Sequence, residues 1–129
     1  MFRHVRCVLF DLDGTLIDSA LDLGLAADEM RVARGLPSLP AAAYRASAGS
    51  GARGMLAVAF GLSPQHDAFN ALREEFLDRY EQRITRLTRL FEDVEQLLST
   101  LNQRGVAWGV VTNKHRRFTL PQCRCHCVR

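Results

Sequence analysis

The sequence predicts an α/β fold with a helical insertion, and three observations support this prediction. Two continuous apolar runs, at about residues 5–10 and 106–111, are typical of parallel strands that are covered on both faces. A helical segment leads directly into the second run, as in a right-handed parallel crossover. The helical stretch between the runs is longer than one crossover needs. We therefore expect two parallel strands at these runs and an α-helical cap inserted over residues 17–85.

The elements before residue 64 follow from apolar spacing and from helix breakers. After the first strand, Ser19 followed by Asp22 predicts a capping box at the start of a helix that ends at Gly35. Pro37 and Pro40 then predict a break in the helical pattern. Beyond the break we expect a short helix over residues 41–46, a turn of small residues over 47–54 and a helix over 55–60.

The later elements show the same kinds of signal. An apolar stripe predicts a helix over residues 64–83, and we expect its aromatic side chains to pack in the core. A further helix is expected over residues 93–104, with Gly105 as its carboxy-terminal cap. The second strand follows and ends in polar residues 112–114. Polar residues therefore follow both strands, and ligands of open α/β sheets bind outside the carboxyl ends of the strands.

Composition and charge narrow the class of protein. A chain of 129 residues with 47% hydrophobic and 24% charged residues is typical of one globular domain or of a fragment of a larger one. The net charge of +3 comes without the dense basic stripe of a nucleic-acid surface. No apolar run approaches the roughly 18 residues of a membrane span. The apolar stretch after Arg6 is cut off at Asp11, which is too short for a signal peptide, so we expect a cytoplasmic location.

The four cysteines are unevenly distributed. Cys7 lies in the first strand, where a thiol usually acts as a small buried hydrophobe. The other three crowd into the last seven residues together with a histidine, and we interpret residues 122–129 as an aberrant, disordered tail. The alternative is a small zinc site, although its spacing differs from the usual paired-cysteine knuckles. The ligands of that site would be Cys123, Cys125, His126 and Cys127.

The polar residues behind the first strand indicate a particular chemistry. Asp11 and Asp13 are two residues apart, so their side chains point the same way while the chain stays extended. Two neighbouring carboxylates are costly to bury unless a cation or a proton offsets their charge. Gly14 allows a sharp turn, and Thr15 offers a hydroxyl at the start of the next segment. This pattern predicts a site that holds a hard divalent cation such as Mg²⁺ and acts on phosphate.

Each polar residue has an expected role in phosphoryl transfer. Asp11 is the candidate nucleophile, which would form an aspartyl-phosphate intermediate, and Asp13 is the candidate general acid and base. Thr112 and Asn113 supply a hydroxyl and an amide that could hold phosphate oxygens. The simpler interpretations are a solvated turn for the two aspartates and a strand-to-loop cap for Thr112 and Asn113.

Two segments resemble the motifs of a known superfamily. Residues 11–16, Asp-Leu-Asp-Gly-Thr-Leu, resemble the first motif of the haloacid dehalogenase-like hydrolases, and residues 110–114, Val-Val-Thr-Asn-Lys, resemble the second. The span from Val5 to Pro121 is most similar to the phosphoglycolate phosphatase group, and within it to the bacterial N-acetylmuramic acid 6-phosphate phosphatases. The segments that prompt this narrower resemblance are residues 30–37, 50–55 and 108–114.

The resemblance implies a fold, a site and a substrate class. It implies an incomplete Rossmann-like core, made of residues 1–16 and 86–121, and a helical cap that selects a small phosphorylated metabolite such as phosphoglycolate or N-acetylmuramic acid 6-phosphate. It implies that Mg²⁺ is bound by Asp11 and by the main-chain carbonyl of Asp13. The residues that it implies for phosphate or substrate binding are Gly14, Thr15, Thr112, Asn113 and, in the cap, Arg53.

The chain departs from the family pattern after Pro121. The pattern includes a later lysine and a later acidic pair, whereas residues 122–129 hold no carboxylate, and Lys114 is too close to the second motif to be that lysine. We therefore expect a truncated or frameshifted chain, weak Mg²⁺ binding, no turnover, and a first strand with one bare flank. The alternatives are a non-catalytic remnant or helical interaction module, and a phosphomutase of the same superfamily. The sequence leaves the oligomeric state open.

Overall fold

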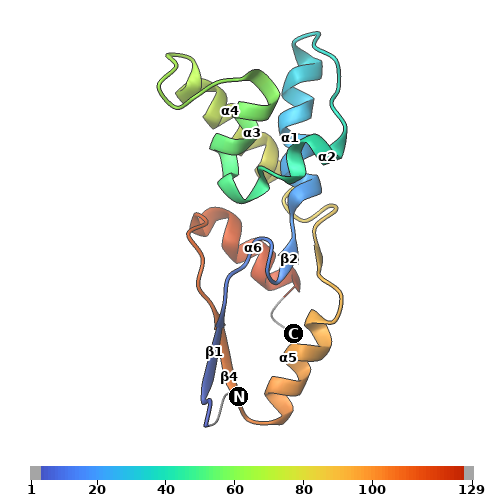
Figure 1. The fold of residues 1–129 in the computed structure, drawn as a ribbon, viewed down its shortest axis with the longest axis vertical. Coiled ribbons are helices and arrows are strands. Elements are labelled where there is room, and N and C mark those ends of the chain that lie inside the picture. Colours follow the sequence, from blue (N-terminus) through green and yellow to red (C-terminus); the bar gives the residue numbers. More distant parts are fainter. Residues whose placement is uncertain (1–3, 127–129) are drawn as a thin grey trace.

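The protein is an α/β structure in which a two-stranded parallel sheet and a set of helices form two lobes (Figure 1). The structure is a computed structural model, and it describes residues 4–126. In chain order the elements are β1 (Cys7–Phe10), β2 (Ile17–Asp18), α1 (Ala20–Ala33), α2 (Ala41–Arg45), the 3₁₀ helix η1 (Ala48–Ser50), α3 (Gly51–Phe60), α4 (Phe69–Gln82), β3 (Arg89–Leu90), α5 (Val94–Gln103), β4 (Ala107–Val110) and α6 (Arg116–His126).

The two expected strands pair in parallel, as the sequence predicts. β1 and β4 run in register from Cys7 opposite Ala107 to Phe10 opposite Val110. Helix α5 covers one face of this sheet, where Phe10 and Trp108 meet edge to face with their ring centroids 6.5 Å apart. The apolar cluster beneath α5 consists of Leu12, Leu16, Ile17, Val94 and Leu98, with Phe10, Leu90, Phe91, Leu101, Trp108, Val110 and Cys123 packed against it.

The opposite face of the sheet is exposed, which the continuous apolar runs did not predict. Leu9 on β1 is 65% exposed, and Val111, directly after β4, is 60% exposed. The expectation of a buried Cys7 is wrong, because its side chain points to the same uncovered face. In the described part of the chain the sheet has two strands, so β1 pairs on one side only.

A second, antiparallel pair joins the two lobes and was not predicted. Ile17 of β2 lies opposite Leu90 of β3, and Asp18 lies opposite Arg89. β2 leads into the helical lobe at α1, and β3 follows its last helix, α4. The pairing of β2 with β3 therefore holds together the two chain segments that connect the helical lobe to the sheet.

The helical lobe has an apolar core of its own. Helix α1 packs against α2, α3 and α4, and at Gly24 it approaches α2 so closely that an added Cβ would lie 2.9 Å from the Tyr44 Cβ. The buried members of this core are Leu23, Ala26, Ala27, Met30, Tyr44, Met55, Leu56, Ala59, Phe69, Phe76, Tyr80 and Phe118. The expected packing of the aromatic stripe on α4 is confirmed at Phe69, Phe76 and Tyr80. The division into a cap over residues 17–85 and a core stays a prediction.

The start of α1 differs from the expected capping box. Ser19 is the residue before the helix, but its hydroxyl donates to Asp13 Oδ1 at 2.6 Å and caps no helical amide. Asp22 is fully buried and accepts hydrogen bonds from the amides of Leu87 and Thr88 at 2.9 and 2.8 Å. Partners outside the helix therefore take the place of the local caps.

Helix α6 lies between the two lobes (Figure 1). Its Phe118 belongs to the helical core, whereas Cys123 packs against the cluster beneath α5. The helix continues past Pro121 to His126, and Gln122 is fully buried. Residues 122–126 therefore differ from the expected disordered tail, because Gln122 and Cys123 have packing partners; residues 127–129 lie outside the described part. Across residues 4–126, no helix combines the length and apolar character that a membrane span requires.

Candidate active site

The turn after β1 buries the leucine that lies between the two aspartates. Leu12 is fully buried, and its carbonyl accepts hydrogen bonds from the amides of Leu16 and Ile17 at 3.0 and 3.1 Å. Asp11 is exposed and Asp13 is half-buried. Gly14 has a φ of +77°, a left-handed conformation that a residue with a Cβ adopts only with strain. The buried leucine thus anchors a tight loop that carries both carboxylates.

The ends of β1 and β4 meet at one edge of the sheet. The Val111 amide donates to the Phe10 carbonyl at 2.8 Å, so the parallel pairing extends to the residue before Asp11. The Thr112 hydroxyl accepts a hydrogen bond from the Lys114 amide at 3.1 Å, as in a strand-to-loop cap. Its hydroxyl hydrogen can still be donated to a ligand. Asn113 is exposed beside it.

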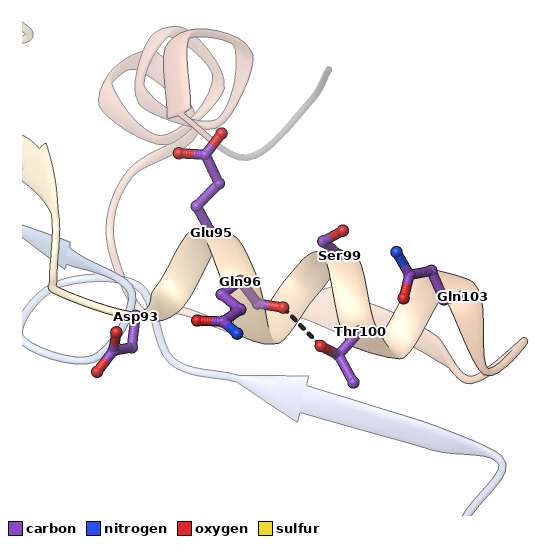
Figure 2. A pocket seen from close by; sticks show the side chains of 6 residues that line it. All are labelled: Asp93, Glu95, Gln96, Ser99, Thr100 and Gln103. Carbon is purple, nitrogen blue, oxygen red and sulfur yellow. Dashed lines mark hydrogen bonds between the residues drawn. The ribbon is translucent and has the colours of Figure 1, made fainter.

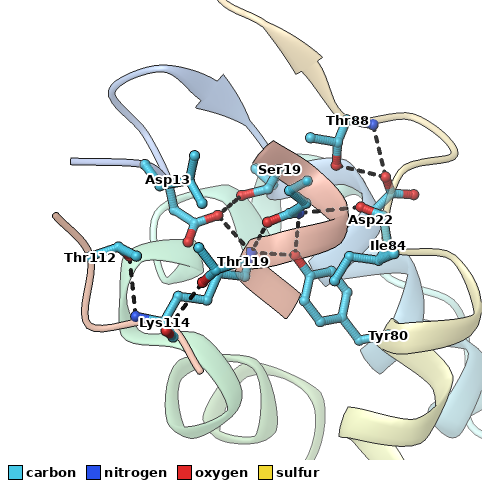
Figure 3. Close-up of polar contacts among 12 residues, drawn as sticks. Asp13, Ser19, Asp22, Tyr80, Ile84, Thr88, Thr112, Lys114 and Thr119 are labelled. Atoms are coloured by element: carbon cyan, nitrogen blue, oxygen red, sulfur yellow. Dashed lines mark hydrogen bonds and ion pairs between the residues drawn. The ribbon is translucent and has the colours of Figure 1, made fainter. Parts of the chain in front are cut away.

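Two donors fix one oxygen of the Asp13 carboxylate. The Ser19 hydroxyl donates to Asp13 Oδ1 at 2.6 Å, and the Lys114 ammonium donates to the same oxygen at 2.9 Å (Figure 3). The Lys114 side chain is 10% exposed and that of Asp13 is 24% exposed. Burial lowers the pKa of Lys114, and the negative charge of Asp13 opposes part of this shift.

The Lys114 ammonium also contacts the helical lobe and α6. It donates to the Tyr80 hydroxyl at 2.7 Å and to Gln122 Oε1 at 2.6 Å, and it lies 5.0 Å from the centre of the Tyr80 ring. Burial, and then the nearby charge of Asp13, raise the pKa of Tyr80. The network of Asp13, Lys114, Tyr80 and Gln122 therefore joins the β1 turn to α4 and α6.

Three residues around Asp13 and Lys114 were not predicted as site residues. The sequence pattern predicted Ser19 as a helix cap, Tyr80 as a core aromatic and Gln122 as part of a disordered tail. One signal was available, because Lys114 is the sole lysine among 17 basic residues and directly follows the Thr112-Asn113 pair. Nothing in the sequence pattern indicates its partners.

Comparison with known proteins identifies the family of the chain. The family model of the haloacid dehalogenase-like hydrolases matches residues 8–126. The chain belongs to this family. The chain is 44% identical over 118 residues to the N-acetylmuramic acid 6-phosphate phosphatase of Pseudomonas aeruginosa, a match that covers 92% of the chain and 52% of that protein. It is 47% identical over 123 residues to the phosphoglycolate phosphatase of Xanthomonas campestris, covering 93% of the chain and 55% of that protein.

Solved structures of the family share the fold. A crystal structure of a predicted phosphoglycolate phosphatase from Haemophilus somnus aligns with a TM-score of 0.80 and 24% identity, over 99% of this chain and 60% of that one. A haloacid dehalogenase-like hydrolase from Streptococcus pneumoniae aligns with a TM-score of 0.78 and 23% identity, over 96% and 57% of the two chains. The chain thus spans about half the length of the curated relatives that it matches.

The fit of Mg²⁺, the cation that we expect at the site, is partial. Asp11 accepts one hydrogen bond, from the Leu12 amide to Oδ1 at 2.8 Å, which leaves its other oxygen available. The main-chain carbonyl of Asp13 accepts no hydrogen bond from the described residues. Within residues 4–126 there is no cluster of three or more His, Cys, Asp or Glu side chains that could hold a metal ion. One carboxylate and one carbonyl suit Mg²⁺ only as a weak site completed by water and substrate phosphate.

The remaining candidate residues take different positions. The amides of Gly14 and Thr15 already donate to Ile17 and Leu12 carbonyls at 2.9 and 3.3 Å, so Gly14 serves the turn and Thr15 offers its exposed hydroxyl. Arg53 is exposed in the first turn of α3. No hydrogen bond or ion pair of the described chain joins Arg53 to the other candidates. Of the proposed zinc ligands, Cys127 lies outside the described residues.

A hollow elsewhere on the surface holds none of the candidate residues. It follows one side of α5 and is lined by polar side chains, with the Thr100 hydroxyl donating to the Gln96 carbonyl at 2.8 Å (Figure 2). Its lining residues are Asp93, Glu95, Gln96, Ser99, Thr100 and Gln103. Because it contains neither strand end, it does not contribute to the site of the two aspartates.

Proposed function

We propose that this chain carries the nucleophile and the acid/base of a Mg²⁺-dependent phosphoric monoester hydrolase. The observation that supports this most strongly is the arrangement at the sheet edge, where Asp11 and Asp13 follow β1 beside Thr112 and Asn113. Membership of a hydrolase family and the names of the curated relatives favour the same chemistry.

In the proposed reaction, Asp11 and Asp13 divide the work. An Asp11 oxygen attacks phosphorus and forms an aspartyl-phosphate, while the bond between phosphorus and the leaving oxygen breaks and Asp13 protonates that oxygen. Asp13 then takes a proton from water, which attacks phosphorus and releases phosphate and free Asp11. Mg²⁺ bound by the Asp11 carboxylate and the Asp13 main-chain carbonyl would offset the negative charge of the phosphate.

Hydroxyl and amide groups at the sheet edge would hold the phosphate oxygens. The Thr112 hydroxyl hydrogen, the Asn113 amide and the exposed Thr15 hydroxyl are the available donors. We propose a small phosphorylated metabolite as substrate, such as phosphoglycolate or N-acetylmuramic acid 6-phosphate, with Arg53 of the cap as a substrate contact. We also propose that the protein is located in the cytoplasm.

For the 129 residues alone we expect no catalytic turnover. The described residues offer Mg²⁺ one carboxylate and one carbonyl, and the three ammonium hydrogens of Lys114 are directed at protein acceptors. The phosphate would therefore have little positive charge to offset its own. A phosphate-release assay on the two metabolites checks this expectation, and Mg²⁺-dependent release that disappears in Asp11→Asn would contradict it.

The function itself is tested by a step that needs no turnover. Beryllofluoride mimics the phosphoryl group of an aspartyl-phosphate, so we expect a bound fluorine-19 NMR signal that requires millimolar Mg²⁺ and is lost in Asp11→Asn. Asp67→Asn is the matched control, because Asp67 is exposed in the loop between α3 and α4, outside the site. A bound signal that survives in Asp11→Asn, or none in the unmodified chain, would overturn the proposed function.

A further inference from the structure

Lys114 has no ammonium hydrogen left for a ligand. An ammonium group carries three donors, and in this structure they point to three acceptors from different elements. These are Asp13 Oδ1 in the β1 turn at 2.9 Å, the Tyr80 hydroxyl on α4 at 2.7 Å and Gln122 Oε1 on α6 at 2.6 Å. Direct binding of phosphate would require one of these bonds to break.

The acceptors of Lys114 are themselves held in place. The Gln122 side-chain amide donates to the Tyr80 hydroxyl at 2.9 Å and to the Ile84 carbonyl at 3.2 Å. Lys114, Tyr80 and Gln122 thus form a closed ring of hydrogen bonds. Asp13 is attached to this ring through Lys114, and Figure 3 shows Lys114 between Asp13 and Tyr80. Tyr80 and Gln122 are both nearly or fully buried, so water competes little for these bonds.

The ring has a consequence for the orientation of Asp13. Both Ser19 and Lys114 donate to Oδ1, so the carboxylate is fixed by two donors on one oxygen. No donor from the described residues reaches Oδ2. A carboxylate held in this way presents one defined oxygen to a reacting group, which is what a general acid and base requires.

We propose that Lys114 is a positioning residue whose ammonium ties the Asp13 carboxylate to Tyr80 of helix α4, so that the acid/base and the cap helix keep one relative placement. The role of Asp13 as acid/base rests on the proposed function, whereas the tie between Asp13 and Tyr80 does not. Lysine suits this position better than arginine, because a compact ammonium serves three separate acceptors and a planar guanidinium favours paired ones.

Carbon-13 NMR of the aspartate side-chain carboxyls tests the tie at neutral pH, with the Asp13 signal assigned by its loss in Asp13→Asn. We expect Tyr80→Phe to shift the Asp13 signal when Lys114 is present. In a chain that carries Lys114→Met, we expect Tyr80→Phe to leave the Asp13 signal unchanged. In a chain that carries Lys114→Arg, we also expect Tyr80→Phe to leave the Asp13 signal unchanged. Tyr44→Phe is the matched control, because Tyr44 is a buried tyrosine of the same lobe that bonds to Asp28 instead.

Three results would overturn the proposal. The first is that Tyr80→Phe shifts the Asp13 signal equally with and without Lys114. The second is that Tyr44→Phe shifts the Asp13 signal as much as Tyr80→Phe does. The third is that the effect of Tyr80→Phe is fully retained when arginine replaces Lys114. If the Lys114 variants do not fold, nitrogen-15 NMR of the side-chain ammonium decides, because the chain has one lysine. We then expect a slowly exchanging ammonium signal that moves in Asp13→Asn; a rapidly exchanging signal indifferent to Asp13→Asn would overturn the proposal. The beryllofluoride test depends on Asp11, so the two proposals can fail separately.

Discussion

Asp28 is a buried carboxylate that holds the loop after α1. Its two oxygens accept hydrogen bonds from the Ser38 hydroxyl at 2.5 Å, the Leu39 amide at 2.8 Å and the Tyr44 hydroxyl at 2.8 Å. Burial alone would raise the pKa of Asp28, but these hydrogen bonds and the charge of Arg31 outweigh it and lower the pKa below the ordinary value of 3.8. Burial and the bond to Asp28 raise the pKa of Tyr44.

The lowered pKa predicts a pH dependence of stability at this residue. A carboxyl whose pKa is lower in the folded state stabilises the fold above its unfolded pKa, and this contribution is lost as the pH falls through the folded pKa. We expect Asp28→Asn to cost about 1–3 kcal/mol at neutral pH and to flatten the acid limb of the stability curve. Urea unfolding over a pH series measures both effects, with Asp67→Asn as control. An unchanged acid limb in Asp28→Asn would contradict this account.

Among the elements, α1 is joined to the segment between α4 and β3 by Asp22, which lies in the first turn of α1. Asp22 accepts from the Thr88 amide and hydroxyl, both at 2.8 Å, and from Arg83 Nε at 3.2 Å. Asp22 is 0% exposed, so its carboxylate oxygens bond to these protein groups and not to bulk water. The connection between α4 and β3 is therefore held by a side chain of α1.

Removal of Asp22 should destabilise the lobe strongly. Asp22→Ala leaves the Thr88 amide and the Arg83 Nε–H group without this acceptor, while the other end of the Arg83 guanidinium keeps its ion pair with Glu29. Each buried donor that loses its partner costs about 1–3 kcal/mol. The control is Asp18→Ala, because Asp18 pairs with Arg45 at the surface, where such a pair contributes about 0–1 kcal/mol. Chemical denaturation compares the two variants. Equal losses of stability would show that Asp22 has no special role.

Elements were predictable where their signals are local. Both parallel strands have continuous apolar runs, and the predicted cap at Gly105 is confirmed: its φ is +66°, and its amide donates to the Asn102 carbonyl at 3.1 Å. The capping box failed because Ser19 and Asp22 bind partners outside the helix, namely Asp13, six positions before Ser19, and Thr88, 66 positions after Asp22. The same reason hid the network of Lys114, since Asp13 and Lys114 are 101 positions apart. Residue pattern indicates which side chains are polar, but only packing selects their partners.

At the scale of the whole molecule, one face of the β1–β4 sheet is apolar and open. Leu9 and Val111 are its most exposed apolar side chains, and β1 pairs on one side only within residues 4–126. Exposed apolar surface beside an unpaired strand edge favours association between chains.

Self-association should therefore depend on this face. We expect Leu9→Lys to raise the dissociation constant of self-association about tenfold or more, because burying one leucine contributes about 1.5–3 kcal/mol. Leu36→Lys is the matched control, because Leu36 is also exposed but lies in the loop between α1 and α2. Sedimentation velocity over a concentration series gives the comparison. If both variants behave alike, association does not involve the sheet face.

Chemical trapping of an aspartyl-phosphate tests whether Asp11 is the nucleophile of a phosphoryl-transfer site. The chain is incubated with acetyl phosphate and Mg²⁺ and then reduced with borohydride, which converts an aspartyl-phosphate to homoserine; peptide mass spectrometry locates the product. If Asp11 is the nucleophile, homoserine forms at position 11, depends on Mg²⁺ and is absent from Asp11→Asn. Homoserine at position 13, or no conversion in the unmodified chain, would contradict this role of Asp11.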